Sequence, residues 1–235
     1  MRIPDKLKWL HVSSIWVYRM LTWVVLGAGF VFAAIILGLR YWVLPNIEQY
    51  REDPIASHVQ AIVSNLGEDP ARAGLRDTPR RFAKAMRALT SGYEADPASV
   101  VGNGIFPAEG DGVVLVRDVE FYSLCEHHLL PFFGRVHVAY LPGDRIIGLS
   151  KIPRLVDLYA RRFQVQERLT EQVADAVVEL LNPKGVIVIA QAQHMCMAMR
   201  GVEKQHSQTA TRALRGVYAT ESQARQEILS MLKDR

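Results

Sequence analysis

Two short segments of the chain gather side chains that can bind a metal ion. Residues 125–128 read CEHH, and residues 194–196 read HMC. Thiolate sulfur and imidazole nitrogen are ligands of zinc, at about 2.3 Å and 2.0 Å. A single Cys-x-x-His pattern more commonly marks a buried thiol beside a hydrogen-bonded imidazole. Because the two segments hold both cysteines and three of the seven histidines of the chain, we interpret them together as one metal site.

The number of candidate ligands indicates which kind of metal site this would be. Cys125, His128 and Cys196 supply three ligands, whereas structural zinc usually has four and catalytic zinc keeps one position for water. A histidine could still complete a structural site. A catalytic zinc ion would lower the pKa of a bound water to about 7. His127 and His194 lie beside the ligands and suit proton transfer, although His127 could instead orient a ligand.

Two further segments carry polar groups suited to an anionic ligand or a purine. Ser150, Lys151 and Arg154 lie where a strand is expected to lead into a helix, whose first N–H groups attract anions. Alone, a basic first turn is usually solvated surface. Glu167 could accept hydrogen bonds from the adjacent N1–H and N2 amino donors of guanine. Alone, it would be read as a helix N-terminal carboxylate favoured by the helix dipole.

The elements expected around these segments mix helices and strands without strict βαβ alternation, which favours an α+β fold with an antiparallel sheet. Helices follow from apolar spacing and are expected over 46–67, 80–93, 152–162, 166–181 and 221–232. Strands follow from β-branched, partly alternating runs and are expected over 113–124, 134–142, 185–193 and 209–218. A turn at 142–144 predicts a hairpin over 134–149, and the Gly- and Pro-rich stretch 92–112 is expected to be a loop.

The charge of the chain argues against nucleic acid as a partner. The formal net charge is +4, but residues 1–44 alone account for it. The remaining residues carry 23 basic and 23 acidic side chains, so the main domain is electrically balanced. A local basic cluster for a small anionic ligand remains compatible with this balance.

Taken together, these segments resemble the GTP cyclohydrolase I family. The resemblance is carried by CEHH, GLSKI and QVQERLT in that order, with TPRRFAKAM before them and SQTATRALRG after them. The three central motifs are highly specific in this order. The resemblance covers roughly residues 50–235 and excludes the apolar N-terminal stretch.

The resemblance implies a role for each matching residue. It assigns Zn²⁺ binding to Cys125, His128 and Cys196, and proton transfer around the purine ring to His127 and His194. It assigns guanine recognition to Glu167 and to Gln166 beside it. The residues that it places on the ribose-triphosphate side are Ser150, Lys151, Arg154 and Arg200, with Arg81 as a further phosphate contact.

The resemblance also implies a reaction and an assembly. Zinc-activated water would add at C8 of the guanine of GTP, C8 would leave as formate, and ring closure would give 7,8-dihydroneopterin triphosphate. This reaction begins tetrahydrofolate and pterin synthesis. Family members adopt the tunnelling fold, in which antiparallel sheets from several subunits close a barrel. They form decamers with active sites at subunit interfaces, so we expect a homo-oligomer with GTP as its substrate.

The N-terminal segment is a departure from typical members of that family. Residues 20–39 hold no charge and lie between Arg19 and Arg40; twenty residues span about 30 Å as a helix. We expect a transmembrane or membrane-anchoring helix within 1–45, ahead of a catalytic domain over 46–235. A signal-like segment and an upstream extension absent from the mature protein are the alternatives. A membrane helix on every subunit would fit a two-ring decamer poorly.

The expected membrane orientation conflicts with the expected chemistry. Basic residues before the span outnumber those close after it, which would hold the N-terminus in the cytoplasm and send the main domain outside. GTP and reduced thiolates belong inside the cell. We therefore expect a cytoplasmic catalytic domain.

Two other functions are compatible with parts of the pattern. One is a relative on the same fold with different chemistry, such as a nitrile reductase with a cysteine nucleophile. The other is a membrane-tethered protein that binds a pterin or a nucleotide without turnover. The complete set of two cysteines and three histidines favours the cyclohydrolase over both.

Overall fold

The computed structural model describes residues 53–233 of the chain. The described residues divide into two compact units, 53–80 and 81–233. The apolar span predicted over 20–39 lies outside the described residues, as does the predicted boundary between residues 45 and 46. Among the helices that are described, none is long and apolar enough to cross a membrane.

The described part of the first unit begins with helix α3, Pro54–Asn65. The side chain of Asp53 caps this helix by accepting a hydrogen bond from the Ile55 backbone N–H at 3.0 Å. Proline suits the first helical position, where an N–H would have no helical partner. The Asp-Pro pair therefore sets the start of α3. Helix α4, Thr78–Leu89, continues across the boundary into the second unit.

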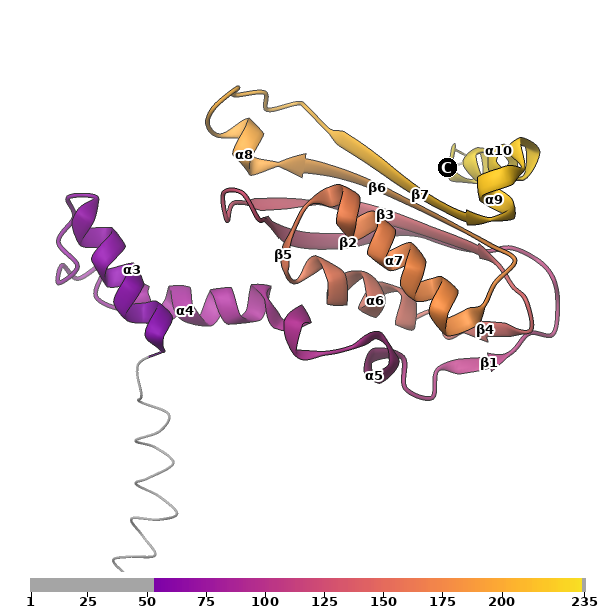
Figure 1. Cartoon of the computed structure of the whole chain (residues 1–235). Helices are drawn as coiled ribbons and strands as arrows, with labels where there is room; N and C mark the ends of the chain where they lie inside the picture. The colour runs from indigo at the N-terminus through magenta and orange to yellow at the C-terminus, as the bar shows by residue number, and fades with distance from the viewer. Residues whose placement is uncertain (1–52, 234–235) are drawn as a thin grey trace, which may run out of the picture. The chain divides into compact units, whose positions relative to one another are not determined.

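The second unit is built on a five-stranded sheet in the order β5-β2-β3-β6-β7 (Figure 1). Its strands are β2 (Val114–Cys125), β3 (Pro131–Leu141), β5 (Phe163–Gln164), β6 (Gly185–His194) and β7 (Thr209–Gly216). The neighbouring pairs are antiparallel except β2 and β5, which run parallel. The predicted α+β class with a mainly antiparallel sheet is confirmed for the described residues.

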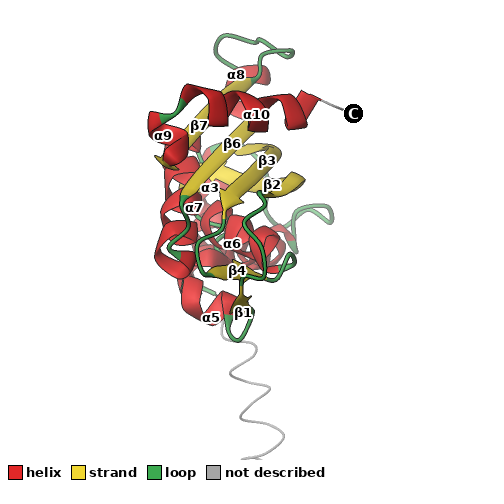
Figure 2. Ribbon diagram, turned by 90° about the vertical axis from the view of Figure 1, so that its right-hand side faces the viewer, coloured by secondary structure: helices red, strands yellow, loops and turns green. Residues whose placement is uncertain are grey.

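Helices α6 (Lys151–Ala160) and α7 (Gln166–Leu181) cover one face of this sheet (Figure 2). Alternation along the strands directs Val136 of β3 and Val188 of β6 into the layer between sheet and helices. There they belong to the same core cluster as Leu169 of α7, and none of the three is more than 1% exposed. Each such buried side chain contributes about 1.5–3 kcal/mol relative to exposure. This layer fixes α7 against β6.

The opposite face of the sheet carries two short C-terminal helices, α9 (Val217–Thr220) and α10 (Ser222–Lys233) (Figure 2). A smaller core cluster joins them to the strands, and its buried members are Ala139, Ile187, Tyr218 and Ile228. On this face Ala139 of β3 and Ile187 of β6 are buried, whereas Arg135 and Gln191, farther along the same two strands, are exposed.

The hairpin predicted over 134–149 is wrong. β3 pairs with β2 on one side and with β6 on the other, so it has no edge left for the residues after the turn. The chain leaves the sheet after Leu141, and β4 (Arg145–Ile147) pairs instead with β1 (Ile105–Pro107) in a separate two-stranded sheet. Alternation along a strand indicates which face is buried, but it does not identify the pairing partner.

The loop predicted over 92–112 is also wrong in part. It holds most of a 3₁₀ turn, η2 (Ser91–Glu94), the short helix α5 (Pro97–Val101), and strand β1. Asp96 begins α5 through a capping box, in which its carboxylate accepts from the Ser99 backbone N–H at 2.9 Å. These capping hydrogen bonds start a helix within a segment whose composition, rich in Gly and Pro, predicted a loop.

Two predicted elements are shorter in the structure. The helix expected over 80–93 ends at Leu89. The strand expected over 209–218 ends at Gly216, which adopts a φ of 57° and turns the chain into α9. A positive φ carries no steric penalty at glycine, so this residue ends the strand.

Gly134 provides a test of the β3–β6 pairing. A Cβ at this position would lie 1.9 Å from the backbone oxygen of Gln191, which cannot move without opening the pair. Gly134→Ala should lower the free energy of unfolding by about 1–3 kcal/mol or more. Each kcal/mol should lower the melting temperature by about 2–4 °C. Gly110→Ala is the control, because a Cβ there meets nothing within 4 Å. Equal melting temperatures for the two variants would contradict the pairing.

Candidate metal centre and active site

The first candidate metal-binding segment follows directly from the end of β2. Cys125 is the last residue of the strand, and its backbone N–H donates to Leu130 O at 2.9 Å. The N–H groups of His128 and Leu129 both donate to Cys125 O, at 3.2 Å and 2.8 Å, so the chain makes one tight turn. Leu129 completes the turn with a φ of 55°, which is uncommon for a residue other than glycine. The turn brings the His128 ring back toward the Cys125 thiol.

The second segment reaches the same place through the sheet. In the β3–β6 pair, Phe132 lies opposite His194. The end of β6 therefore comes beside the start of β3, which follows the CEHH turn. The short helix α8 (Met195–Ala198) begins at this point and carries Cys196.

Three candidate ligand atoms converge within one chain. The ligand atoms of Cys125, His128 and Cys196 all lie within 4.8 Å of one another. Cys125 Sγ is 3.8 Å from His128 Nδ1. Tetrahedral zinc, with bonds of about 2.3 Å to sulfur and 2.0 Å to nitrogen, places neighbouring ligand atoms roughly 3.5–3.8 Å apart. The donor set and its spacing therefore fit a zinc ion.

His127 lies beside this group without belonging to it. Its Nδ1 is 3.8 Å from Cys125 Sγ, and its Nε2 is 4.0 Å from Glu126 Oε1. The converging ligand atoms found among residues 53–233 do not include those of His127. Its side chain is 64% exposed, so the ring is accessible to solvent and to a ligand beside the candidate metal position.

The electrostatics of the two cysteines also fit a cation between them. Both are free thiols. Burial raises the pKa of the Cys196 thiol, and the neighbouring Cys125 raises this pKa further, whereas Arg200 lowers it. A divalent cation would stabilise both thiolates, because a thiol that coordinates such an ion is deprotonated.

His194 is held between an aromatic ring and an amide. Its ring stacks on Phe132, with centroids 4.6 Å apart and planes inclined by 3°. Its Nε2 lies 2.9 Å from Gln166 Oε1. Burial lowers the pKa of His194, and the carboxylate of Glu167 acts in the opposite direction. The structure thus places His194, Gln166 and Glu167 together at the start of α7.

An ion pair ties the CEHH turn to α7. Arg168 donates two hydrogen bonds to the Glu126 carboxylate, at 2.6 Å and 3.1 Å, and so lowers the pKa of Glu126. The Glu126 backbone N–H donates to Gln164 O at 3.0 Å. Sequence reasoning assigned no role to either charged residue, because 42 positions separate them and no local pattern relates the turn to a later helix. These bonds fix the turn relative to the start of α7.

The residues predicted for the triphosphate lie in several places. Ser150 takes the N-cap position of α6, but its side chain makes no capping hydrogen bond. The Lys151 side chain lies against Gly104, where an added Cβ would be 2.7 Å from Lys151 Cε. Arg154 lines a cavity of about 330 Å³ between α6 and the segment around α5. The other two predicted residues are Arg200, which follows α8, and Arg81, which lies on α4.

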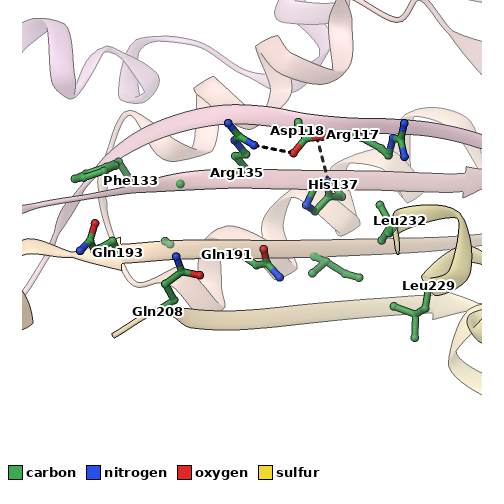
Figure 3. Close-up of a pocket in the computed structure, with 13 residues that line it drawn as sticks. Arg117, Asp118, Phe133, Arg135, His137, Gln191, Gln193, Gln208, Leu229 and Leu232 are labelled. Atoms are coloured by element: carbon green, nitrogen blue, oxygen red, sulfur yellow. Dashed lines mark hydrogen bonds and ion pairs between the residues drawn. The ribbon is translucent and has the colours of Figure 1, made fainter. Parts of the chain in front are cut away.

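A second hollow, of about 650 Å³, lies on the sheet face that carries α10 (Figure 3). Asp118 sits at a bulge of β2 with a φ of 55°. Its carboxylate accepts a hydrogen bond from Arg135 at 3.3 Å, and its backbone N–H donates to His137 Nδ1 at 3.1 Å. No residue predicted for the active site lines this hollow, so it is separate from the candidate metal centre.

Comparison with known proteins identifies the family. The family model described as GTP cyclohydrolase I matches residues 55–233. GTP cyclohydrolase 1 of Deinococcus radiodurans is 59% identical over 168 residues, which cover 72% of this chain and 78% of that protein. GTP cyclohydrolase 1 of Leptospira biflexa is 55% identical over 175 residues, covering 74% and 96%, respectively.

A solved structure, the archaeosine synthase QueF-Like in the apo form, covers 46% of this chain and 97% of its own. Its sequence identity is 18% and its TM-score 0.39, a similarity too low to support a conclusion. The chain belongs to the GTP cyclohydrolase I family.

Proposed function

We propose that this chain is a zinc-dependent hydrolase that converts GTP and water to 7,8-dihydroneopterin 3′-triphosphate and formate, the first step of tetrahydrofolate and pterin synthesis. The observation that carries the proposal is the convergence of the Cys125, His128 and Cys196 ligand atoms within 4.8 Å of one another. Membership of the family and identities of 55–59% to proteins named GTP cyclohydrolase 1 support it.

Cys125, His128 and Cys196 would hold the zinc ion. Three protein ligands are typical of catalytic rather than structural zinc. When bound, zinc supplies a Lewis acid that activates water as a nucleophile near neutral pH. The ion pair between Glu126 and Arg168 would keep the CEHH turn in place, so that little reorganisation accompanies binding.

The two histidines outside the ligand set would move protons as the guanine ring opens. The ring of His194 is held in one plane by Phe132 and bonded to Gln166, so it presents a defined nitrogen to a bound purine. His127 is exposed beside Cys125 and would exchange protons with the substrate or with solvent.

Glu167 would recognise the guanine base. Its side chain is exposed in the first turn of α7, and its charge is close enough to act on His194. A carboxylate accepts hydrogen bonds from both donors on the N1–H and N2 amino edge of guanine, whereas adenine lacks this pair of donors. This contact would favour GTP over ATP.

The triphosphate would be bound partly by a second copy of the chain. In one chain, Lys151 lies against Gly104 and Arg154 lines the cavity near α5. Among the described strands, β7 has a neighbour on one side only, and β2 meets β5 over its last two residues only. Pairing between such edges would extend the sheet across subunits into the barrel of the tunnelling fold, and would give a homo-oligomer, a decamer by family resemblance.

The adjacent histidines of the CEHH turn should differ in their effect on zinc. His128→Ala removes one of the three converging ligands and should lower zinc affinity by at least about tenfold. His127→Ala should retain stoichiometric zinc, because its ring is outside the ligand group. Zinc content after dialysis against a mild chelator measures both. Retention of zinc by His128→Ala, or its loss from His127→Ala, would contradict the ligand assignment.

Formate release tests the reaction and the guanine contact together. The zinc-loaded full-length chain should release formate from GTP and not from ATP. Glu167→Ala should lower kcat/KM for GTP by roughly 10- to 100-fold, as expected for loss of charged hydrogen bonds worth about 1.5–3 kcal/mol. Glu171→Ala, one turn later on α7, is the control, because that carboxylate pairs with Arg215. No formate from the wild-type chain would refute the reaction, and an unchanged preference for GTP in Glu167→Ala would refute the contact.

Mixed oligomers test whether two chains share one site. Cys125→Ser and Lys151→Ala should each be inactive alone. Co-assembled in equal amounts, they should regain activity in about one quarter of the sites, because sites at a subunit interface can combine an intact half from each chain. Absence of recovery in verified mixed oligomers would place both residues in a site made by one chain.

A further inference from the structure

The Gln166 side chain is buried and engaged on several sides. The residue is 1% exposed, although it begins α7 immediately before the exposed Glu167. Its Nε2 lies 3.1 Å from Ala190 O and 3.0 Å from Thr209 O, so it bridges β6 and β7. A ligand approaching the first turn of α7 would therefore meet the carboxylate of Glu167 rather than the amide of Gln166.

The acceptors around Gln166 determine which way its amide points. A backbone carbonyl can only accept a hydrogen bond, so the atom that faces Ala190 O and Thr209 O must be the amide nitrogen. Thr211 Oγ1 lies 3.2 Å from the same nitrogen. Thr170 Oγ1 donates its proton to Gln166 O at 2.8 Å, so the 2.6 Å contact between the two hydroxyls uses the proton of Thr211. Both amide hydrogens are directed at the two carbonyls, so the Thr211 oxygen can only share one of them.

The amide oxygen of Gln166 consequently faces His194. This oxygen can only accept, and it lies 2.9 Å from His194 Nε2. Nε2 must therefore carry a hydrogen, in the neutral ring as well as in the protonated one. In the neutral ring the lone pair is then on Nδ1. The tautomer is assigned from the hydrogen-bond network. The network ends on two backbone carbonyls, which can only accept, so the amide of Gln166 cannot be turned around.

We infer that Gln166 is a positioning residue that fixes His194 as the Nε2–H tautomer and leaves Nδ1 to exchange a proton with the substrate. The inference rests on the proposed role of His194 in proton transfer. It gives Gln166 a role different from the guanine contact that the family resemblance implied. The amide orients the imidazole from the buried side, as the group bonded to the second nitrogen of a functional histidine commonly does, and Glu167 meets the base.

Nuclear magnetic resonance of the ring nitrogens tests the tautomer directly. The zinc-loaded full-length chain, with histidine labelled in ¹⁵N and ¹³C, would be measured at about pH 8.5, where ordinary imidazoles are neutral. The His194 signals, identified by their loss in His194→Asn, should be those of the Nε2–H form. A proton on Nδ1 in the wild-type chain would overturn the inference. This readout needs no turnover of GTP, so it separates the inference from the proposed reaction.

A matched pair of variants tests the consequence for catalysis. Gln166→Met removes the amide at nearly constant volume, and Gln172→Met does the same on the same helix, where the amide contacts Gln164 at 2.7 Å. Gln166→Met should give a mixture of tautomers and lower kcat for formate release at least about tenfold, with KM for GTP changed less than about threefold. Gln172→Met should keep the wild-type tautomer and kcat.

Two outcomes in Gln166→Met would overturn the inference. A raised KM with unchanged kcat and tautomer would assign Gln166 to substrate binding. A lowered kcat with the wild-type tautomer would show that the amide acts by another route. Should this variant fail to fold, the spectrum of the wild-type chain alone decides, because it requires no substitution at Gln166.

Discussion

Cys125 and Cys196 meet because β2, β3 and β6 are neighbouring antiparallel strands. β3 starts at the end of the sheet where β2 finishes, and β6 runs antiparallel to β3. The last residues of β2 and β6 therefore lie at the same end of the sheet. Burial raises the pKa of the Cys196 thiol, and the neighbouring Cys125 raises it further. A cation bound between the two sulfur atoms would stabilise both thiolates.

The other residues of the candidate site are either buried groups that hold His194 or exposed side chains. On the buried side, Phe132 and Gln166 hold the ring of His194 by stacking and by a hydrogen bond. On the open side, His127 and Glu167 are exposed beside the metal group and at the start of α7. Burial of the orienting groups and exposure of those that would meet a substrate is the arrangement expected of a preorganised site.

Much of this could be predicted from the sequence, and the exceptions have physical reasons. The convergence of the candidate ligands could be predicted because two short segments that combine cysteine with histidine are typical of metal binding. The helix over 166–181 could be predicted because its apolar periodicity is long. The bond from Gln166 to His194 joins residues 28 positions apart and depends on strand pairing that no local pattern encodes. The prediction of a hairpin over 134–149 was wrong for the same reason, because the partners of β3 are β2 and β6 rather than the residues after the turn.

X-ray absorption at the zinc edge tests the central claim most directly. For the zinc-loaded full-length chain, the account predicts two sulfur ligands at about 2.3 Å, one imidazole nitrogen at about 2.0 Å, and one light-atom ligand from solvent. The solvent ligand should be replaced or perturbed when GTP is added. A first shell without two sulfurs, or one closed by four protein ligands and unchanged by GTP, would contradict the account.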